Sequence, residues 1–177
     1  MGSEVIKIAN CSGYYGDRLS AAKEMVEGGP IDVLTGDYLA ELTMTILFNQ
    51  KLKRGDDKGY VGTFLKQLKD VAKTCKEKEI KIVTNAGGLN PKSMANEIQI
   101  ILSELGLEMQ VAYIDGDDLM PRMSDLQNSG EEFINIDKEI SLKDSGYTTL
   151  TANAYLGAWG IKAVSYTHLT LPTSNGV

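Results

Sequence analysis

Hydrophobic and polar positions repeat one arrangement four times along the chain. A short apolar run rich in β-branched residues is followed by Gly, Asp or Asn, and then by apolar residues at helical spacing. The four runs are VIKIAN (5–10), IDVLT (31–35), IKIVTNA (80–86) and MQVAYID (109–115). Apolar runs of this length predict buried strands, and the spacing after them predicts helices, because side chains three or four positions apart share a helical face.

Each expected helix carries an apolar face. These faces are Leu19, Ala22 and Val26 in the first helix; Leu39, Leu42 and Ile46 in the second, from residue 38 to 52; Phe64, Leu65, Leu68, Val71, Ala72 and Cys75 in the third; and Met94, Ile98, Ile101, Leu102 and Leu105 in the fourth. Gly28, Gly29 and Pro30 end the first helix. The polar stretch KRGDDKG separates the second helix from the third.

Alternating strands and helices indicate an α/β fold. Parallel strands joined by right-handed crossovers place helices on the sheet faces, so we expect a Rossmann-like three-layer sandwich with a mostly parallel sheet. Residues 127–150 are polar and weakly patterned, which favours a long loop or a small hairpin. TANAYLGAWGIKA (151–163) predicts a closely packed helix of small residues.

Composition narrows the function classes. The chain has 177 residues, 42% of them hydrophobic, which is enough for one domain with a sizeable core. Its 18 Lys and Arg against 24 Asp and Glu give a net charge of -6, which argues against nucleic acids and anionic membrane surfaces as partners. No apolar run reaches the roughly 20 residues of a membrane-spanning helix, and we expect a cytoplasmic protein. Cys11 and Cys75 are far apart in sequence, and no disulfide framework is expected.

Candidate chemistry lies in the loops after the strands. In open parallel sheets, ligands bind outside the carboxyl ends of the strands, where these loops converge. The polar residues that we expect there are Asn10, Ser12, Asp17 and Arg18; Asp37 and Glu41; Asn85, Gly87, Gly88 and Asn90; and Asp115, Asp117, Asp118 and Arg122.

Two of these loops allow a structural and a functional interpretation. Gly87 and Gly88 stand where a strand ends and a helix begins, so their amides either bind an anion or only form a tight turn. NAGGLNP matches neither the dinucleotide nor the ATP fingerprint. Asp37 is either a functional carboxylate or the N-cap of its helix, with Glu41 one turn in.

The other loops are equally open. Asp115, Asp117 and Asp118 suit a divalent cation or a raised carboxyl pKa, and also a solvated acidic turn. Arg18 binds a substrate carboxylate or phosphate with two hydrogen bonds, or pairs with the neighbours of Asp17 or with another acidic loop. Cys11 is a nucleophile only if its thiolate is stabilised, and a buried inert thiol is the default.

The only histidine, His168, lies in an ending of different character. VSYTHLTLPT has no charge and continues no pattern, and it back-translates to a transposon adapter used for sequencing libraries. We therefore expect residues 164–177 to be a non-native, adapter-derived tail. Without His168, a catalytic triad that needs histidine is unsupported.

Five strings, taken in order, carry a family resemblance. They are ANCSGYYGDR, GGPIDVLTGDYLAELTM, VTNAGGLNP, DGDDL and TANAYLGAWGI. Together they resemble the acyclic terpene utilisation AtuA family, earlier known as a domain of unknown function, over residues 4–163. Members of that family are longer, so residues 1–163 resemble the N-terminal part of an AtuA-like α/β domain. The resemblance implies catabolism of branched, terpene-derived acids handled as coenzyme A thioesters, beside carboxylase and hydratase steps.

Two hypotheses follow. The first is an enzyme of hydratase or lyase type that acts on a small branched acyl or acyl-CoA carboxylate. In it, Asp37, Glu41 and Asp117 supply acid–base groups or position a metal. The residues expected to bind the substrate are Asn10, Ser12, Arg18, Asn85, Gly87, Gly88 and Asp118. The second is a non-catalytic ligand-binding or scaffolding subunit of a carboxylase-linked complex. The sequence identifies no cofactor or metal, and leaves both a homo-oligomer and a catabolic-complex partner open.

Overall fold

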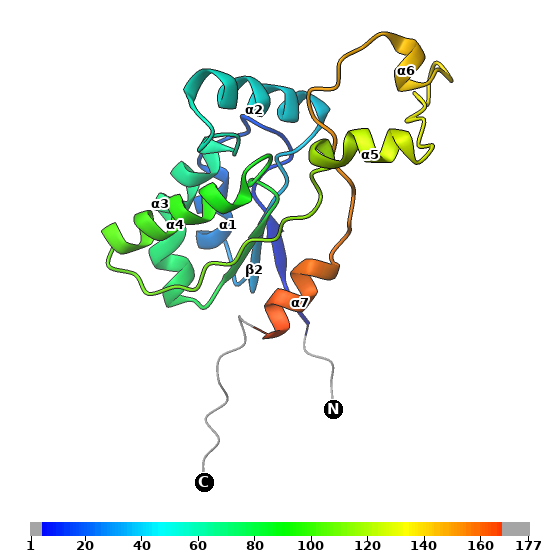
Figure 1. The fold of residues 1–177 in the computed structure, drawn as a ribbon. Helices are drawn as coiled ribbons and strands as arrows, with labels where there is room; N and C mark the ends of the chain where they lie inside the picture. The colour runs from blue at the N-terminus through cyan, green and yellow to red at the C-terminus, as the bar shows by residue number, and fades with distance from the viewer. Residues whose placement is uncertain (1–4, 168–177) are drawn as a thin grey trace.

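A three-stranded parallel sheet organises the fold (Figure 1). The structure, a computed structural model, describes residues 5–167, and His168 lies outside them. Strand β1 (Ile8–Asn10) pairs with β2 (Val33–Gly36), and β2 pairs with β3 (Lys81–Thr84), giving the order β1-β2-β3. The strands predicted in the first three apolar runs are therefore confirmed, and their carboxyl ends lie at one edge of the sheet.

Four helices follow the predicted spacing. They are α1 (Ala21–Glu27), α2 (Glu41–Arg54), α3 (Gly62–Glu77) and α4 (Pro91–Glu104). Figure 1 shows α1, α3 and α4 gathered on one side of the sheet, with α3 contacting both of the others. The C-terminal part holds a 3-10 turn η1 (Met120–Arg122) and the helices α5 (Met123–Asn128), α6 (Leu142–Ser145) and α7 (Trp159–Thr167).

Helix α3 separates two groups of core residues. On one side Phe64, Leu68 and Ala72 pack in a cluster with α2 and α4. On the other side Val71 and Cys75 pack in a cluster with α1 and β2. Both sets were predicted as one apolar face, and the face is wide because α3 is buried by helices on both sides.

The second helix differs from its prediction. It begins at Glu41 rather than at residue 38, so Leu39 lies before it. Its buried residues are Thr43, Met44 and Leu47, whereas Leu42 is 73% exposed. The predicted apolar face was wrong at Leu42. Met44 and Leu47 also have helical spacing, and only the packing of the helix against its neighbours decides which set of apolar residues is buried.

The fourth apolar run is extended but forms no strand in the described residues. The sheet therefore has three strands rather than four, and the predicted three-layer sandwich is not confirmed. The α/β class and the parallel sheet are confirmed.

The C-terminal third agrees with the sequence prediction only in part. Residues 127–150 were expected to be a long loop or a small hairpin, and they contain the end of α5 and the short helix α6. In this stretch, Asn135 and Leu142 donate backbone N–H groups to the carbonyls of Ile140 and Glu132. The helix predicted over 151–163 begins only at Trp159. Before it, residues 152–154 lie alongside 117–119 with two backbone hydrogen bonds of 2.8 Å.

Candidate functional site

Three polar residues stand at the carboxyl ends of adjacent strands. Asn10 ends β1, Asp37 follows β2 directly, and Asn85 follows β3 directly. Because the strands are parallel and β2 is central, Asp37 lies between the other two. Three of the four loops that were predicted to converge therefore do so, whereas Asp117 of the fourth loop bonds Asn153 instead.

Asp37 and Asn85 are joined by a side-chain hydrogen bond. The amide Nδ2 of Asn85 donates to Oδ1 of Asp37 at 2.6 Å. The backbone N–H of Tyr38 donates to Oδ1 of Asn85 at 2.9 Å, which fixes the orientation of the Asn85 amide. Both side chains are exposed, so the carboxylate is oriented by the protein and still accessible.

The β1 loop joins the same group through Asn10 and Ser12. Nδ2 of Asn10 donates to the carbonyl of Ser12 at 2.8 Å, and the Thr35 hydroxyl donates to Oδ1 of Asn10 at 3.2 Å. That carbonyl of Ser12 also accepts the backbone N–H of Asp37 at 3.0 Å. We call Asn10, Ser12, Asp37 and Asn85 the strand-end cluster.

The capping interpretation of Asp37 is wrong. The N-cap of α2 is Ala40, which has no side-chain hydrogen bond to the helix. Glu41 is exposed in the first turn of α2, where its charge favours the helix dipole. Asp37 is therefore held by Asn85 rather than used to start the helix.

Arg18 pairs with an acidic neighbour. Its guanidinium donates to the carboxylate of Glu24 at 2.7 Å, and both side chains are largely exposed. The adjacent Asp17 accepts the backbone N–H groups of Gly13 and Arg18, which lower the pKa of its carboxyl group. The pair with Glu24 draws Arg18 toward α1, and an exposed guanidinium remains free to change partner.

Backbone amides in and after the Gly87–Gly88 turn donate hydrogen bonds to carbonyl groups of the protein. The N–H of Gly88 donates to the carbonyl of Asn85, that of Leu89 to Gly59, and that of Asn90 to Gly87. Asn90 caps α4 by accepting the N–H of Ser93 at 3.2 Å. These protein partners occupy the amides of Gly88, Leu89 and Asn90 and support the tight-turn interpretation.

The acidic loop is held by the segment before α7. Oδ2 of Asp117 accepts from Nδ2 of Asn153 at 3.0 Å, and Oδ1 of Asp118 accepts the backbone N–H of Met120 at 2.9 Å. Asp115 is exposed. In the part of the chain that the structure describes, no group of three or more His, Cys, Asp or Glu residues is arranged to hold a metal ion.

A buried polar group behind the cluster was not predicted. The Tyr38 hydroxyl donates to Oε1 of Gln67 at 2.5 Å and lies 3.9 Å from Sγ of Cys11. Nε2 of Gln67 donates to the carbonyl of Arg18 at 3.3 Å. Tyr38 therefore links the loops after β1 and β2 to α3. The sequence signal was Gln67 itself, a polar residue between Phe64 and Val71 on an otherwise apolar face.

Both cysteines behave as buried thiols. Burial raises the pKa of Cys11, and it raises the pKa of Cys75 to about 11. We therefore expect neither thiol to react with a disulfide reagent in the native protein at mildly alkaline pH, and both to react after unfolding. Absorbance from the released thiolate measures both stages. A fast-reacting thiol in the native protein would show that Cys11 is activated.

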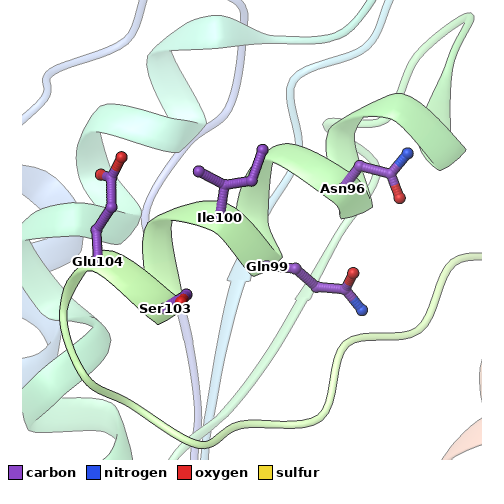
Figure 2. Close-up of a pocket in the computed structure, with 5 residues that line it drawn as sticks. All are labelled: Asn96, Gln99, Ile100, Ser103 and Glu104. Carbon is purple, nitrogen blue, oxygen red and sulfur yellow. The ribbon is translucent and has the colours of Figure 1, made fainter.

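A pocket elsewhere involves none of the predicted residues. It is lined by Asn96, Gln99, Ile100, Ser103 and Glu104, all on one face of α4 (Figure 2). Its one carboxylate, Glu104, pairs with the exposed Lys69 of α3 at 3.7 Å. The strand-end cluster, built from three loops, is the better candidate.

A family model for the acyclic terpene utilisation family protein AtuA matches residues 6–164. The chain belongs to this family. Comparison with curated proteins and with solved structures gives no match. AtuA-family membership suggests a role in acyclic terpene utilisation.

The strings that carried the resemblance hold the site. In this AtuA-family chain they contain Asn10 and Ser12, Asp37, and Asn85, which form the strand-end cluster. They also contain Asp117 and its partner Asn153. Among the helices of residues 5–167, none has the length and apolar character needed to cross a bilayer.

Proposed function

We propose that this AtuA-family chain is a catabolic enzyme that acts on a small branched acyl group, as a free carboxylate or a coenzyme A thioester, by hydratase or lyase chemistry. The observation that carries the proposal is the hydrogen bond between Asn85 and Asp37 at the carboxyl edge of the sheet. An exposed carboxylate held in one orientation is suited to proton transfer.

Asp37 is the acid–base group in this proposal. Asn85 donates to Oδ1, which leaves Oδ2 to take a proton from a water that adds to the β-carbon of an unsaturated acyl group while the carbon next to the carbonyl gains a proton. In the reverse direction, Oδ2 takes the proton from that carbon while the β-hydroxyl group leaves as water. Asn10 is exposed on the adjacent side of the site, and Ser12, which is buried, holds its loop through the N–H of Asp37. Arg18 supplies a positive charge for the substrate carboxylate or for coenzyme A phosphates. Glu41 and Asp117 are secondary acid–base candidates.

Gly87, Gly88 and Asp118 have supporting roles. The two glycines let the chain turn directly after Asn85, and Asp118 holds the start of η1 through the N–H of Met120. Their contact with substrate stays a prediction.

The test is turnover and binding of branched acyl probes. 3-Methylbut-2-enoyl-CoA and 3-methylbut-2-enoate, which carry the double bond that hydration needs, are offered to the protein, with but-2-enoyl-CoA as the unbranched comparison. Asp37→Asn keeps the size of the side chain and removes its charge, so turnover of an accepted probe should fall about a hundredfold. Turnover is followed by chromatography and binding by calorimetry.

Asp32→Asn is the matched control. Asp32 precedes β2 and accepts the N–H of Lys7, so it lies at the opposite end of the strand that leads to Asp37. Its replacement should leave turnover unchanged. Equal losses in the two variants, or no branched probe bound, would reject the proposal.

A second candidate function is a non-catalytic subunit of a carboxylase-linked complex. It is favoured by large apolar side chains at the surface of the C-terminal part: Ile136 is 93%, Tyr155 95% and Trp159 78% exposed. Exposed apolar groups of this size mark partner surfaces. Binding of a branched probe without turnover, together with co-purification of a carboxylase, would favour this function.

A further inference from the structure

Residues 107–112 have the side-chain pattern of a strand. Leu107, Met109 and Val111 are half-buried against the cluster formed by α2, α3 and α4, whereas the residues that alternate with them are exposed. This alternation is the period of a β-strand. Within the described residues, no backbone N–H from 108 to 118 donates a hydrogen bond. The segment therefore has the inward face of a strand without a ladder partner.

Strand β3 has an unpaired backbone edge. In residues 5–167, β3 pairs with β2 on one side and with no strand on the other. Ile82 of β3 packs against the same cluster as Met109 and Val111. Since α1, α3 and α4 lie on one side of the sheet, a right-handed crossover through α4 places the next strand beside β3 and parallel to it.

The segment also has room to move. A hollow lies between it and α4, lined by Gln99, Leu102 and Ser103 on the helix and by residues 106–109. Figure 2 shows the extended chain passing on the side of α4 toward which Gln99 points. The side chains of residues 107–109 therefore do not fill the space beside α4, and a shift of this segment could fill it.

We propose that residues 107–112 are a strap that closes onto the free edge of β3 as a fourth parallel strand. Closure pairs backbone groups that are unpaired in the open arrangement. It also carries the loop of Asp115–Asp118 to the carboxyl end of β3, beside Asn85 and Asp37. This last consequence rests on the proposed function, whereas the pairing of the strap with β3 does not.

Disulfide trapping tests the closure, because it reports which side chains of the two strands lie on the same face of the sheet. Ile82 shares the sheet face of its partner Leu34, which packs against α1, so Val83 lies on the other face. In a closed strap the exposed residues Gln110 and Ala112 share the face of Val83. With an added oxidant, Val83→Cys should cross-link to Gln110→Cys or Ala112→Cys about tenfold more than to Val111→Cys, whose side chain lies on the opposite face.

Cross-linking is read by peptide mass spectrometry without any ligand, so its result is independent of acyl-probe turnover. No excess of either outward pair over the Val111→Cys control would overturn the proposal. If the paired variants do not fold, amide hydrogen exchange of the unmodified protein decides. Closure predicts slow exchange at every second amide from 108 to 113, because alternate N–H groups of an edge strand face its neighbour. Uniformly fast exchange would reject it.

Discussion

Gly88→Ala is expected to lower the free energy of unfolding by about 3 kcal/mol or more. Gly88 has φ +53°, a left-handed conformation that costs an L-residue about 1 kcal/mol. An added Cβ would also overlap the Leu47 side chain, which is fully buried, and lie 2.9 Å from the carbonyl oxygen of Gly59. Neither the Gly59 backbone nor the buried Leu47 side chain can move away from the added Cβ without disturbing its own packing, so steric strain adds to the conformational cost. Urea unfolding followed by circular dichroism measures the loss.

Gly106→Ala separates the two causes. Gly106 follows α4 with φ +67°, and an added Cβ would meet no heavy atom within 4 Å. Its variant carries only the conformational cost, about 1 kcal/mol. If the two variants lose the same free energy, the contact with Leu47 and Gly59 has no energetic weight.

The fold was predictable where local pattern and burial agree. The strands around Leu34 and Ile82 follow from their apolar runs and the helix around Leu68 from its helical spacing, because these side chains pack in the core. Strand β1 follows from its apolar run as well, although Ile8 is 65% exposed. The pattern of apolar residues fails to predict a strand where strand formation depends on a hydrogen-bonded neighbouring strand. Val111 lies in a run as strand-like as the others, yet a strand also needs backbone hydrogen bonds, which no sequence period specifies.

The sequence predicted the location of the site but not the hydrogen bonds within it. Parallel topology puts Asn10, Asp37 and Asn85 at one edge wherever the strands are recognised. Which side chains bond depends on distances of a few tenths of an ångström, so the Asp37–Asn85 pair was not foreseen. Asp117 shows the reverse: predicted for the same edge, it bonds Asn153 of a segment expected to be helical.

The buried group behind the cluster supplies the other large expected effect. Gln67→Leu leaves the Tyr38 hydroxyl without its acceptor and removes one of the two donors to the Arg18 carbonyl, which keeps the N–H of Ala21, and should cost about 2 to 3 kcal/mol of unfolding free energy. Tyr38→Phe leaves Oε1 of Gln67 buried without a donor and should cost about 2 kcal/mol. Tyr14→Phe, at an exposed tyrosine, should change stability by less than about 0.5 kcal/mol.

The double variant tests whether the interaction itself carries this cost. With Tyr38→Phe and Gln67→Leu combined, the hydroxyl and its acceptor are both gone, so the loss should fall short of the sum by at least about 1 kcal/mol. Strict additivity would mean that each residue acts through packing alone. The backbone N–H of Tyr38 orients Asn85, so a shift of Tyr38 also reaches Asp37. If the double variant recovers stability but not turnover of a branched acyl probe, the hydrogen-bonded pair of Tyr38 and Gln67 positions the strand-end cluster as well as stabilising the fold.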